Sequence, residues 1–249
     1  MFKIIRLAWA IWFLFLFIVL FFVLYIPFRI LLSRKKWYSQ AHVLRKVWAF
    51  CILYPAALWP SVTFETKLDK RKTYIFCSNH FSYLDIVLTN LLIPNYFNFM
   101  AKDALGRIPV FGIFFRTIDI SVNRTNIRES HQAFKEADKR IKEGVSVLIF
   151  PEGGIHNQVP PMAPFKAGAF KLAIENQIPI VPITLLDNWK RMPGGGVDNG
   201  LLPGRMRMVV HREVSTVGLN LNDQSQLKAK VFSIIDEEFK RHNPSVFIK

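Results

Sequence analysis

Two polar side chains five residues apart, His80 and Asp85, could form a general acid–base pair. Five residues on a continuous helix turn through about 500°, which would place the two side chains on different faces. They can meet only if His80 lies on a strand-to-helix turn and Asp85 lies in the first helical turn, with Ser82 as the N-cap between them. Asp85 could then accept a hydrogen bond from one imidazole nitrogen and leave the other as a base. On spacing alone, a purely structural turn explains the pair equally well.

Three other charged residues stand at comparable places in the chain, each at or after the end of an apolar, strand-like run. Lys102, Arg124 and Glu152 follow the second, third and fourth of these runs, as His80 follows the first. In an open α/β sheet, ligands bind beyond the carboxyl ends of the strands. The four positions together therefore predict one functional site.

The elements that must carry these residues alternate between strand and helix. We predict an α/β fold with a central, largely parallel sheet covered by helices, preceded by an N-terminal membrane-associated two-helix segment. The predicted strands are residues 73–77, 98–101, 118–122, 146–150, 180–185 and 205–214. The predicted helices of this part of the chain are residues 82–93, 126–143, 166–176 and 223–239, with Gly144 ending the second.

The sequence lacks the motifs of several common classes of enzyme. The chain contains no Gly-x-Ser-x-Gly elbow and no His-Glu-x-x-His, and its six histidines show no zinc-ligand spacing. Cys51 and Cys77 are not in a metal-binding spacing either, so we expect two reduced thiols in apolar surroundings. A histidine base without a protein nucleophile suits direct attack by a substrate hydroxyl, and we expect no metal or other cofactor.

Charge and hydropathy divide the chain near residue 63. Residues 1–64 contain eight Lys or Arg and no Asp or Glu, whereas the remainder carries 25 basic and 18 acidic residues. We therefore predict an N-terminal hydrophobic two-helix membrane anchor at residues 1–63 and an α/β domain at residues 64–249. The formal net charge of +15 implies a polyanionic partner. Because the densest charge flanks apolar helices, we expect an anionic membrane surface and not nucleic acid.

Two apolar runs form the predicted anchor. Residues 7–28 are 22 uncharged residues, about 33 Å of helix and long enough to cross a bilayer. Residues 47–60 are too short to span and contain Pro55, so they predict an interfacial or re-entrant helix. Basic residues lie on both sides of the first run, which weakens the positive-inside bias. A hairpin in one leaflet is favoured slightly over a spanning helix.

The sequence resembles the glycerolipid acyltransferases, most closely the PlsC-type 1-acylglycerol-3-phosphate acyltransferase family, over about residues 70–190. Any single block of this resemblance is weak, but four blocks in order at suitable distances are highly specific. The blocks are Asn79-His80 through Asp85; Lys102 through Leu105 with Pro109, Gly112 and Arg124; Phe150-Pro151-Glu152-Gly153 followed by Pro164 through Ala169; and Ile178 through Ile183.

The resemblance implies that His80 deprotonates the free hydroxyl of lysophosphatidic acid while Asp85 orients the ring. An acyl thioester of coenzyme A or acyl carrier protein would be the donor, and no covalent acyl-enzyme would form. Arg124, Glu152 and Gly153 map to positions that bind the glycerol phosphate, and a guanidinium suits bidentate phosphate contact. The same resemblance places the protein at the cell membrane, with its catalytic domain on the cytoplasmic face.

One departure from the family pattern concerns the phosphate site. The family usually continues Glu-Gly with Thr-Arg-Ser, whereas this chain reads Gly154-Ile155-His156. We expect Lys166 or His156 to supply the missing donor, with Lys102 as a further substrate contact or an ordinary surface lysine. Two alternative functions stay open: acylation of glycerol 3-phosphate or another lysolipid, and a non-catalytic, basic, membrane-anchored lipid-binding protein.

Overall fold

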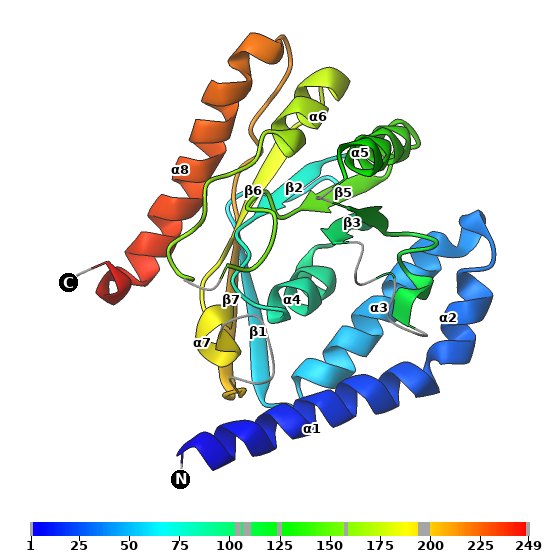
Figure 1. The fold of residues 1–249 in the computed structure, drawn as a ribbon, viewed down its shortest axis with the longest axis vertical. Helices are drawn as coiled ribbons and strands as arrows, with labels where there is room; N and C mark the ends of the chain where they lie inside the picture. Colours follow the sequence, from blue (N-terminus) through cyan, green and yellow to red (C-terminus); the bar gives the residue numbers. More distant parts are fainter. Residues whose placement is uncertain are drawn as a thin grey trace.

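A single mixed sheet forms the centre of the fold. The computed structural model describes residues 2–102, 106, 111–123, 126–156, 159–193 and 200–247. The seven-stranded sheet has the order β1-β7-β6-β2-β5-β3-β4 (Figure 1). Neighbouring strands are parallel except β6 and β7, which run antiparallel. The predicted largely parallel α/β sheet is confirmed.

Six of the seven strands were predicted to within a few residues, and their side chains feed two cores. The strands are β1 (Leu58–Phe64), β2 (Ile75–Ser78), β3 (Phe97–Lys102), β4 (Ile120–Val122), β5 (Ser146–Ile149), β6 (Ile180–Leu185) and β7 (Gly204–Val210). Successive side chains of a strand point to opposite faces. In β2, Phe76 joins the core on one face while Ile75 and Cys77 join the core on the other.

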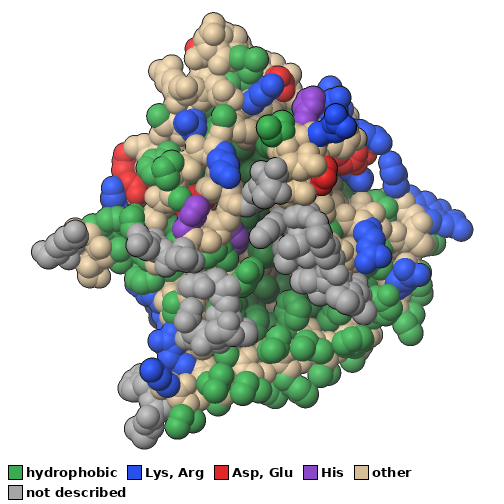
Figure 2. All heavy atoms as spheres, viewed as in Figure 1, with side chains coloured by type: hydrophobic (Ala, Val, Ile, Leu, Met, Phe, Trp, Pro, Cys, Tyr) green, Lys and Arg blue, Asp and Glu red, His purple; other side chains and the backbone are tan. Residues whose placement is uncertain are grey.

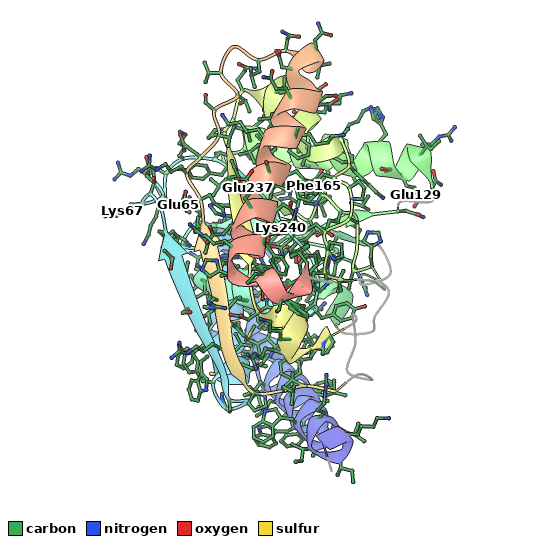
Figure 3. All side chains as sticks on the ribbon, turned by 90° about the vertical axis from the view of Figure 1, so that its left-hand side faces the viewer. Glu65, Lys67, Glu129, Phe165, Glu237 and Lys240 are labelled. Carbon is green, nitrogen blue, oxygen red and sulfur yellow. The ribbon has the colours of Figure 1, made fainter. Side chains whose placement is uncertain are left out.

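Three helices cover the second face, where Ile75 and Cys77 lie: α5 (Ile127–Lys142), α6 (Gly168–Asn176) and α8 (Gln224–His242). Local signals set the ends of α5. The Asn126 side chain caps its first turn by accepting from the N–H groups of Arg128 and Glu129, and Gly144 follows its end at φ +82°. Figure 3 shows α8 crossing the sheet, with Glu237 and Lys240 along it.

The first face is covered by α4 (Leu84–Leu92) together with the N-terminal helices, which are α1 (Phe2–Val23), α2 (Tyr25–Leu31) and α3 (Tyr38–Leu53). The short helix α7 (Asn188–Arg191) follows β6. A buried ion pair fixes α3 to the sheet, since Arg45 Nη1 lies 2.7 Å from Asp119 Oδ2 just before β4. The N-terminal helices are therefore part of the same packed body as the sheet (Figure 1).

The second apolar run, residues 47–60, differs from its prediction. It is helical only to Leu53, and from Leu58 the chain becomes β1, an edge strand that pairs in parallel with β7. Pro60 is compatible with this position, because an edge strand tolerates a residue without an N–H donor. Strand β1 spans the predicted boundary between residues 63 and 64, and the division into two domains stays a prediction.

Helix α1 presents an apolar surface to its surroundings. Within Lys3–Val23, an 18-residue stretch has a mean hydropathy of 2.5, and 17% of its residues are buried. By length and composition this helix could cross a membrane. Its inner face carries Phe13 and Phe21 into the core, whereas Ile11, Phe15 and Phe22 are exposed. Figure 2 shows hydrophobic side chains gathered over α1 along the lower edge of the molecule. One apolar N-terminal helix is thus available to anchor the protein to a membrane.

Candidate active site

The structure brings His80 and Asp85 together at the carboxyl end of β2. Strand β2 ends at Ser78, His80 lies in the following turn, and Asp85 occupies the first turn of α4. His80 Nδ1 lies 3.0 Å from Asp85 Oδ2, so the condition under which the two side chains could meet is fulfilled. The predicted N-cap is wrong by one residue, because Tyr83 occupies that position and makes no side-chain cap. Ser82 Oγ instead accepts the N–H of Leu84, the first helical residue, at 3.2 Å.

The Asp85 carboxylate is fully buried and is held by donors from three directions. Its Oδ2 atom accepts the backbone N–H groups of Phe81 at 2.7 Å and Ser82 at 2.9 Å, in addition to His80. Its Oδ1 atom accepts Nδ2 of Asn188 at 2.8 Å. A buried carboxylate is stable only when it is hydrogen-bonded in this way. Asp85 is therefore set to orient the imidazole.

The His80 ring is fixed on a second side by an aromatic neighbour. Phe150, directly after β5, stacks on the imidazole with 4.0 Å between ring centroids and 15° between the ring planes. With Nδ1 facing Asp85, the other nitrogen, Nε2, makes no hydrogen bond to any described residue, and 11% of the side chain is exposed. This arrangement leaves Nε2 as the nitrogen that could take a proton from a ligand.

Glu152 supports the same turn through the backbone. Its Oε1 atom accepts the N–H of His80 at 2.6 Å, and its Oε2 atom accepts the N–H of Ala163 at 2.9 Å. Burial raises the pKa of Glu152 to about 8, and the two backbone hydrogen bonds partly oppose that rise. The carboxyl group thereby joins the turn after β2, the turn after β5 and the segment before α6.

Gly153 and Lys166 lie against each other beside this turn. Gly153 has φ +89°, and a Cβ atom built on it would lie 2.7 Å from Nζ of Lys166. The Lys166 N–H donates to the carbonyl of Pro151 at 2.8 Å, which fixes the base of the lysine. His156 Nε2 lies 3.5 Å from the carbonyl oxygen of Glu152. Of the two predicted replacements for the missing arginine, Lys166 lies against the glycine of the third block.

The remaining predicted residues lie on the neighbouring strands. Lys102 is the last residue of β3, where it pairs with Val122 of β4, so its backbone ends at the same sheet edge as His80. Its side chain lies outside the described part of the structure, and so does the whole of Arg124. The contribution of both residues to phosphate binding stays a prediction.

Sequence reasoning gave no role to three contributors to the site: Asn79 and Phe150, which both lie within the family-like blocks, and Asn188. The Asn79 amide exchanges two hydrogen bonds with the backbone of Leu185, 3.0 Å and 2.8 Å long, and so ties the turn after β2 to the end of β6. Asn188 lies 103 residues from Asp85 in the chain. Its position after β6 was the one available signal, because β6 is parallel to β2 and ends at the same edge.

A family model described as "Acyltransferase" matches residues 60–186, more than half of the 249 residues. The chain belongs to the acyltransferase family. The match includes the whole His80–Asp85 turn, Glu152 and the buried strand β6. The sequence-based recognition of this family is confirmed, and the buried pair lies within the family domain.

The chain is also similar in sequence to individual acyltransferases. A chloroplast 1-acyl-sn-glycerol-3-phosphate acyltransferase of Brassica napus is 31% identical over 76% of this chain and 54% of its own length. A 1-acyl-sn-glycerol-3-phosphate acyltransferase of Haemophilus influenzae is 31% identical over 51% of this chain and 53% of its own. The chain thus spans about half the length of the curated relatives it matches.

A solved structure extends the likeness to the whole fold. The crystal structure of the 1-acyl-sn-glycerophosphate (LPA) acyltransferase PlsC from Thermotoga maritima aligns with a TM-score of 0.78 over 97% of both chains, at 22% identity. At that identity the comparison establishes a shared fold. The shared fold includes the N-terminal helices, since nearly the entire chain aligns.

Proposed function

We propose that this acyltransferase moves an acyl group from an acyl thioester to the sn-2 hydroxyl of lysophosphatidic acid, giving phosphatidic acid. The main support for this proposal is the buried His80–Asp85 pair, in which Nε2 of the histidine is directed away from the aspartate. The Brassica napus and Haemophilus influenzae relatives bear the name of this activity and so support the choice of acceptor. The donor is acyl-coenzyme A or acyl-acyl carrier protein.

In the proposed reaction, His80 Nε2 removes the proton from the acceptor hydroxyl as its oxygen attacks the thioester carbonyl carbon. A C–O bond forms, the tetrahedral adduct collapses, and the C–S bond breaks. The departing thiolate takes the proton that His80 holds, so the enzyme returns to its starting state without an acyl-enzyme. Asp85 stabilises the imidazolium between the two transfers, and a general base of this kind contributes about 10²–10⁴-fold.

We assign the glycerol phosphate to the surface beside Gly153. Lys166 offers a positive charge there, and Lys102 ends β3. Arg124, which follows β4 by two residues in the sequence, is the further proposed contact. Both carboxylate oxygens of Glu152 already accept backbone N–H groups, which favours a role in shaping the His80 turn. Gly153 keeps the backbone open to a ligand and to the lysine.

We further propose that the protein acts at the cell membrane, with its catalytic domain on the cytoplasmic face. Both the acceptor and the product carry long acyl chains, so the reaction has to take place at a bilayer surface. The exposed apolar side of α1 and the basic residues after α2 suit an anionic leaflet, at about 1 kcal/mol per well-placed Lys or Arg. Nucleic acid is not a proposed partner.

The test is an acyl-transfer assay on the purified full chain in mixed micelles. Lysophosphatidic acid, glycerol 3-phosphate and lysophosphatidylcholine are each offered with acyl-coenzyme A and with acyl-acyl carrier protein. We expect phosphatidic acid from lysophosphatidic acid with at least one donor. If only glycerol 3-phosphate is acylated, it and not lysophosphatidic acid is the acceptor. If none of the three acceptors is acylated, the proposal is overturned.

A further inference from the structure

Asn188, at the start of α7, is placed against the far side of the catalytic pair. Its Nδ2 atom donates to Asp85 Oδ1 at 2.8 Å, and the residue is 1% exposed. The other carboxylate oxygen receives the imidazole and two backbone N–H groups, whereas the amide of Asn188 is the donor to Oδ1 within the described residues. The two oxygens are therefore held by separate segments of the chain.

The amide of Asn188 has one possible orientation against this partner. An ionised carboxylate accepts hydrogen bonds and has none to donate, so the NH₂ end of the amide must face Asp85. The amide oxygen is left buried without a partner among the described residues. Buried polar atoms usually find a partner, and an unpaired one costs free energy. Other buried asparagines, among them Asn95 and Asn243, also carry an unpaired amide oxygen, so this cost does not by itself mark Asn188. Asn188 differs from them because its N–H is aimed at the carboxylate that contacts the His80 imidazole.

An ion pair between the buried Asp187 and the partly exposed Arg207 holds the turn that carries Asn188. The carboxylate of Asp187 receives Nε of Arg207 at 2.7 Å and Nη2 at 2.8 Å, and also the Arg207 backbone N–H at 3.1 Å. Such a bidentate fork fixes geometry as well as charge. Burial opposes ionisation of Asp187, but its hydrogen bonds with Arg207 prevail and lower the pKa of the carboxyl. Strand β7 thereby braces the turn between β6 and α7.

We propose that Asn188 is a positioning residue for acyl transfer and that Arg207 and Asp187 hold it in place. Fixing Oδ1 fixes the plane of the Asp85 carboxylate, and that plane decides whether Oδ2 points along the Nδ1–H bond of His80. The orientation of the base is thus set partly from β7, on the side of β2 away from Glu152. This inference rests on the proposed function, because it assigns the residue to that reaction.

The experiment compares two substitutions of buried asparagines in full-length enzyme. Asn188→Leu keeps the approximate shape and removes the donor to Asp85. Asn95→Leu is the matched control, since Asn95 is also buried, its Nδ2 atom donates to the carbonyls of Asp69 and Lys72, and its amide oxygen lacks a partner among the described residues. Steady-state kinetics across the pH range are combined with NMR of ¹⁵N-histidine-labelled protein. The His80 Nδ1–H signal is assigned by its absence in His80→Gln.

For Asn188→Leu we expect kcat to fall about 10- to 100-fold, as for loss of a hydrogen bond to a charged group, with little change in KM. The Nδ1–H signal should broaden or move, and the pH at which kcat/KM reaches half its plateau should shift. Asn95→Leu should leave all three readouts as in the wild type. Equal kinetics and an unchanged signal in Asn188→Leu would overturn the inference.

A second variant covers the case in which Asn188→Leu does not fold. Arg207→Gln releases the brace at a partly exposed position, and we expect a smaller loss of kcat at constant KM. An unchanged kcat in Arg207→Gln would overturn the role given to the brace. The two proposals can also fail separately. If the wild type acylates none of the acceptors but the His80 Nδ1–H signal still changes in Asn188→Leu, the proposed function is wrong and the positioning contact is supported.

Discussion

The turn after β2 and the outer side of α1 differ in the interactions that their side chains make. Around His80 and Asp85, position is set by short, directional hydrogen bonds from four segments of the chain, nearly all of them buried. Along α1, apolar side chains such as Phe15 and Phe22 are exposed, and their ring contacts are with aromatic neighbours on the same helix. The first region therefore depends on individual atoms, whereas the second depends on apolar area.

This difference decides how each region should respond to change. Removing one atom group from a directional network misplaces all its neighbours, so single substitutions there should have large and specific effects. Removing one side chain from an apolar surface subtracts its area and little else. Substitutions in the two regions should therefore differ both in the size of their effect and in the property that they alter.

The largest effect should come from the base itself. His80→Ala removes both the proton acceptor and the partner of Asp85, and we expect kcat to fall by about 10²–10⁴-fold. Acyl transfer to lysophosphatidic acid measures the loss, and circular dichroism checks that the fold is kept. A variant that folds normally and transfers acyl groups at the wild-type rate would remove His80 from the mechanism.

Two adjacent phenylalanines in α1 allow a buried and an exposed side chain of the same helix to be compared. Phe21 is 4% exposed and Phe22 is 59% exposed. Phe21→Ala should lower the free energy of unfolding by about 3–5 kcal/mol, because it leaves a cavity among aromatic neighbours. Phe22→Ala should leave stability nearly unchanged and weaken partitioning into anionic vesicles by up to about 1.5–3 kcal/mol.

Urea unfolding in detergent and vesicle flotation measure the two quantities separately. The matched pair differs by one position, so helix propensity and length are held constant. Equal loss of stability in both variants would mean that the exposed side of α1 is packed against protein and not against lipid.

Glu152 predicts a pH dependence of stability. Its pKa is raised by burial from 4.5 to about 8, so the folded state binds a proton that the unfolded state releases. Stability from this group is fully present below the unfolded pKa and is lost as the pH rises through about 8. The loss should amount to a few kcal/mol, at about 1.36 kcal/mol for each pKa unit.

Thermal or urea unfolding at a series of pH values measures this dependence. Glu152→Gln has no proton to lose and should show a flatter profile over the same interval, although it replaces one acceptor oxygen. A wild-type profile as flat as that of the variant would show that Glu152 stays ionised on its two backbone N–H groups.

The smallest predicted effect concerns Gly153. Gly153→Ala should cost about 1–2 kcal/mol for a side chain at positive φ, and the new Cβ should push Lys166 aside. We expect KM for lysophosphatidic acid to rise severalfold with kcat little changed. Gly144→Ala is the control, since Gly144 has φ +82° but a Cβ atom added there would have nothing within 4 Å. It should cost similar stability and leave KM unchanged.

Elements specified by local signals could be predicted from the sequence. Gly144 marked the end of the predicted helix that corresponds to α5, and short apolar runs marked the buried strands. Strand β1 could not be predicted, because its residues continue an apolar run and contain Pro60. They become a strand only because β7 offers an unpaired edge, which is information held more than a hundred residues away.

The same division applies to the site. His80 and Asp85 lie in one turn, so their five-residue spacing allowed a contact between them, and the charged residues after the neighbouring strands made it the expected one. Asn188 reaches that turn only through the packing of β6 beside β2, and Phe150 stacks on His80 only because β5 lies on the other side of β2. Such contacts depend on the order of strands in the sheet, which spacing along the chain does not encode.

Three hydrogen bonds between α1 and the rest of the fold give this helix a further property. Trp9 Nε1 donates to the carbonyl of Ala56 at 2.7 Å, Trp12 Nε1 donates to that of Pro55 at 3.0 Å, and the Leu201 N–H donates to the carbonyl of Arg6 at 3.0 Å. The apolar helix is thus fixed to the segments that precede β1 and β7 and is not a tether. Wherever α1 comes to rest in a leaflet, the height and tilt of His80 above that plane are fixed with it. The fold therefore sets how far the active site lies from the lipid, and this distance does not vary independently of the depth of α1.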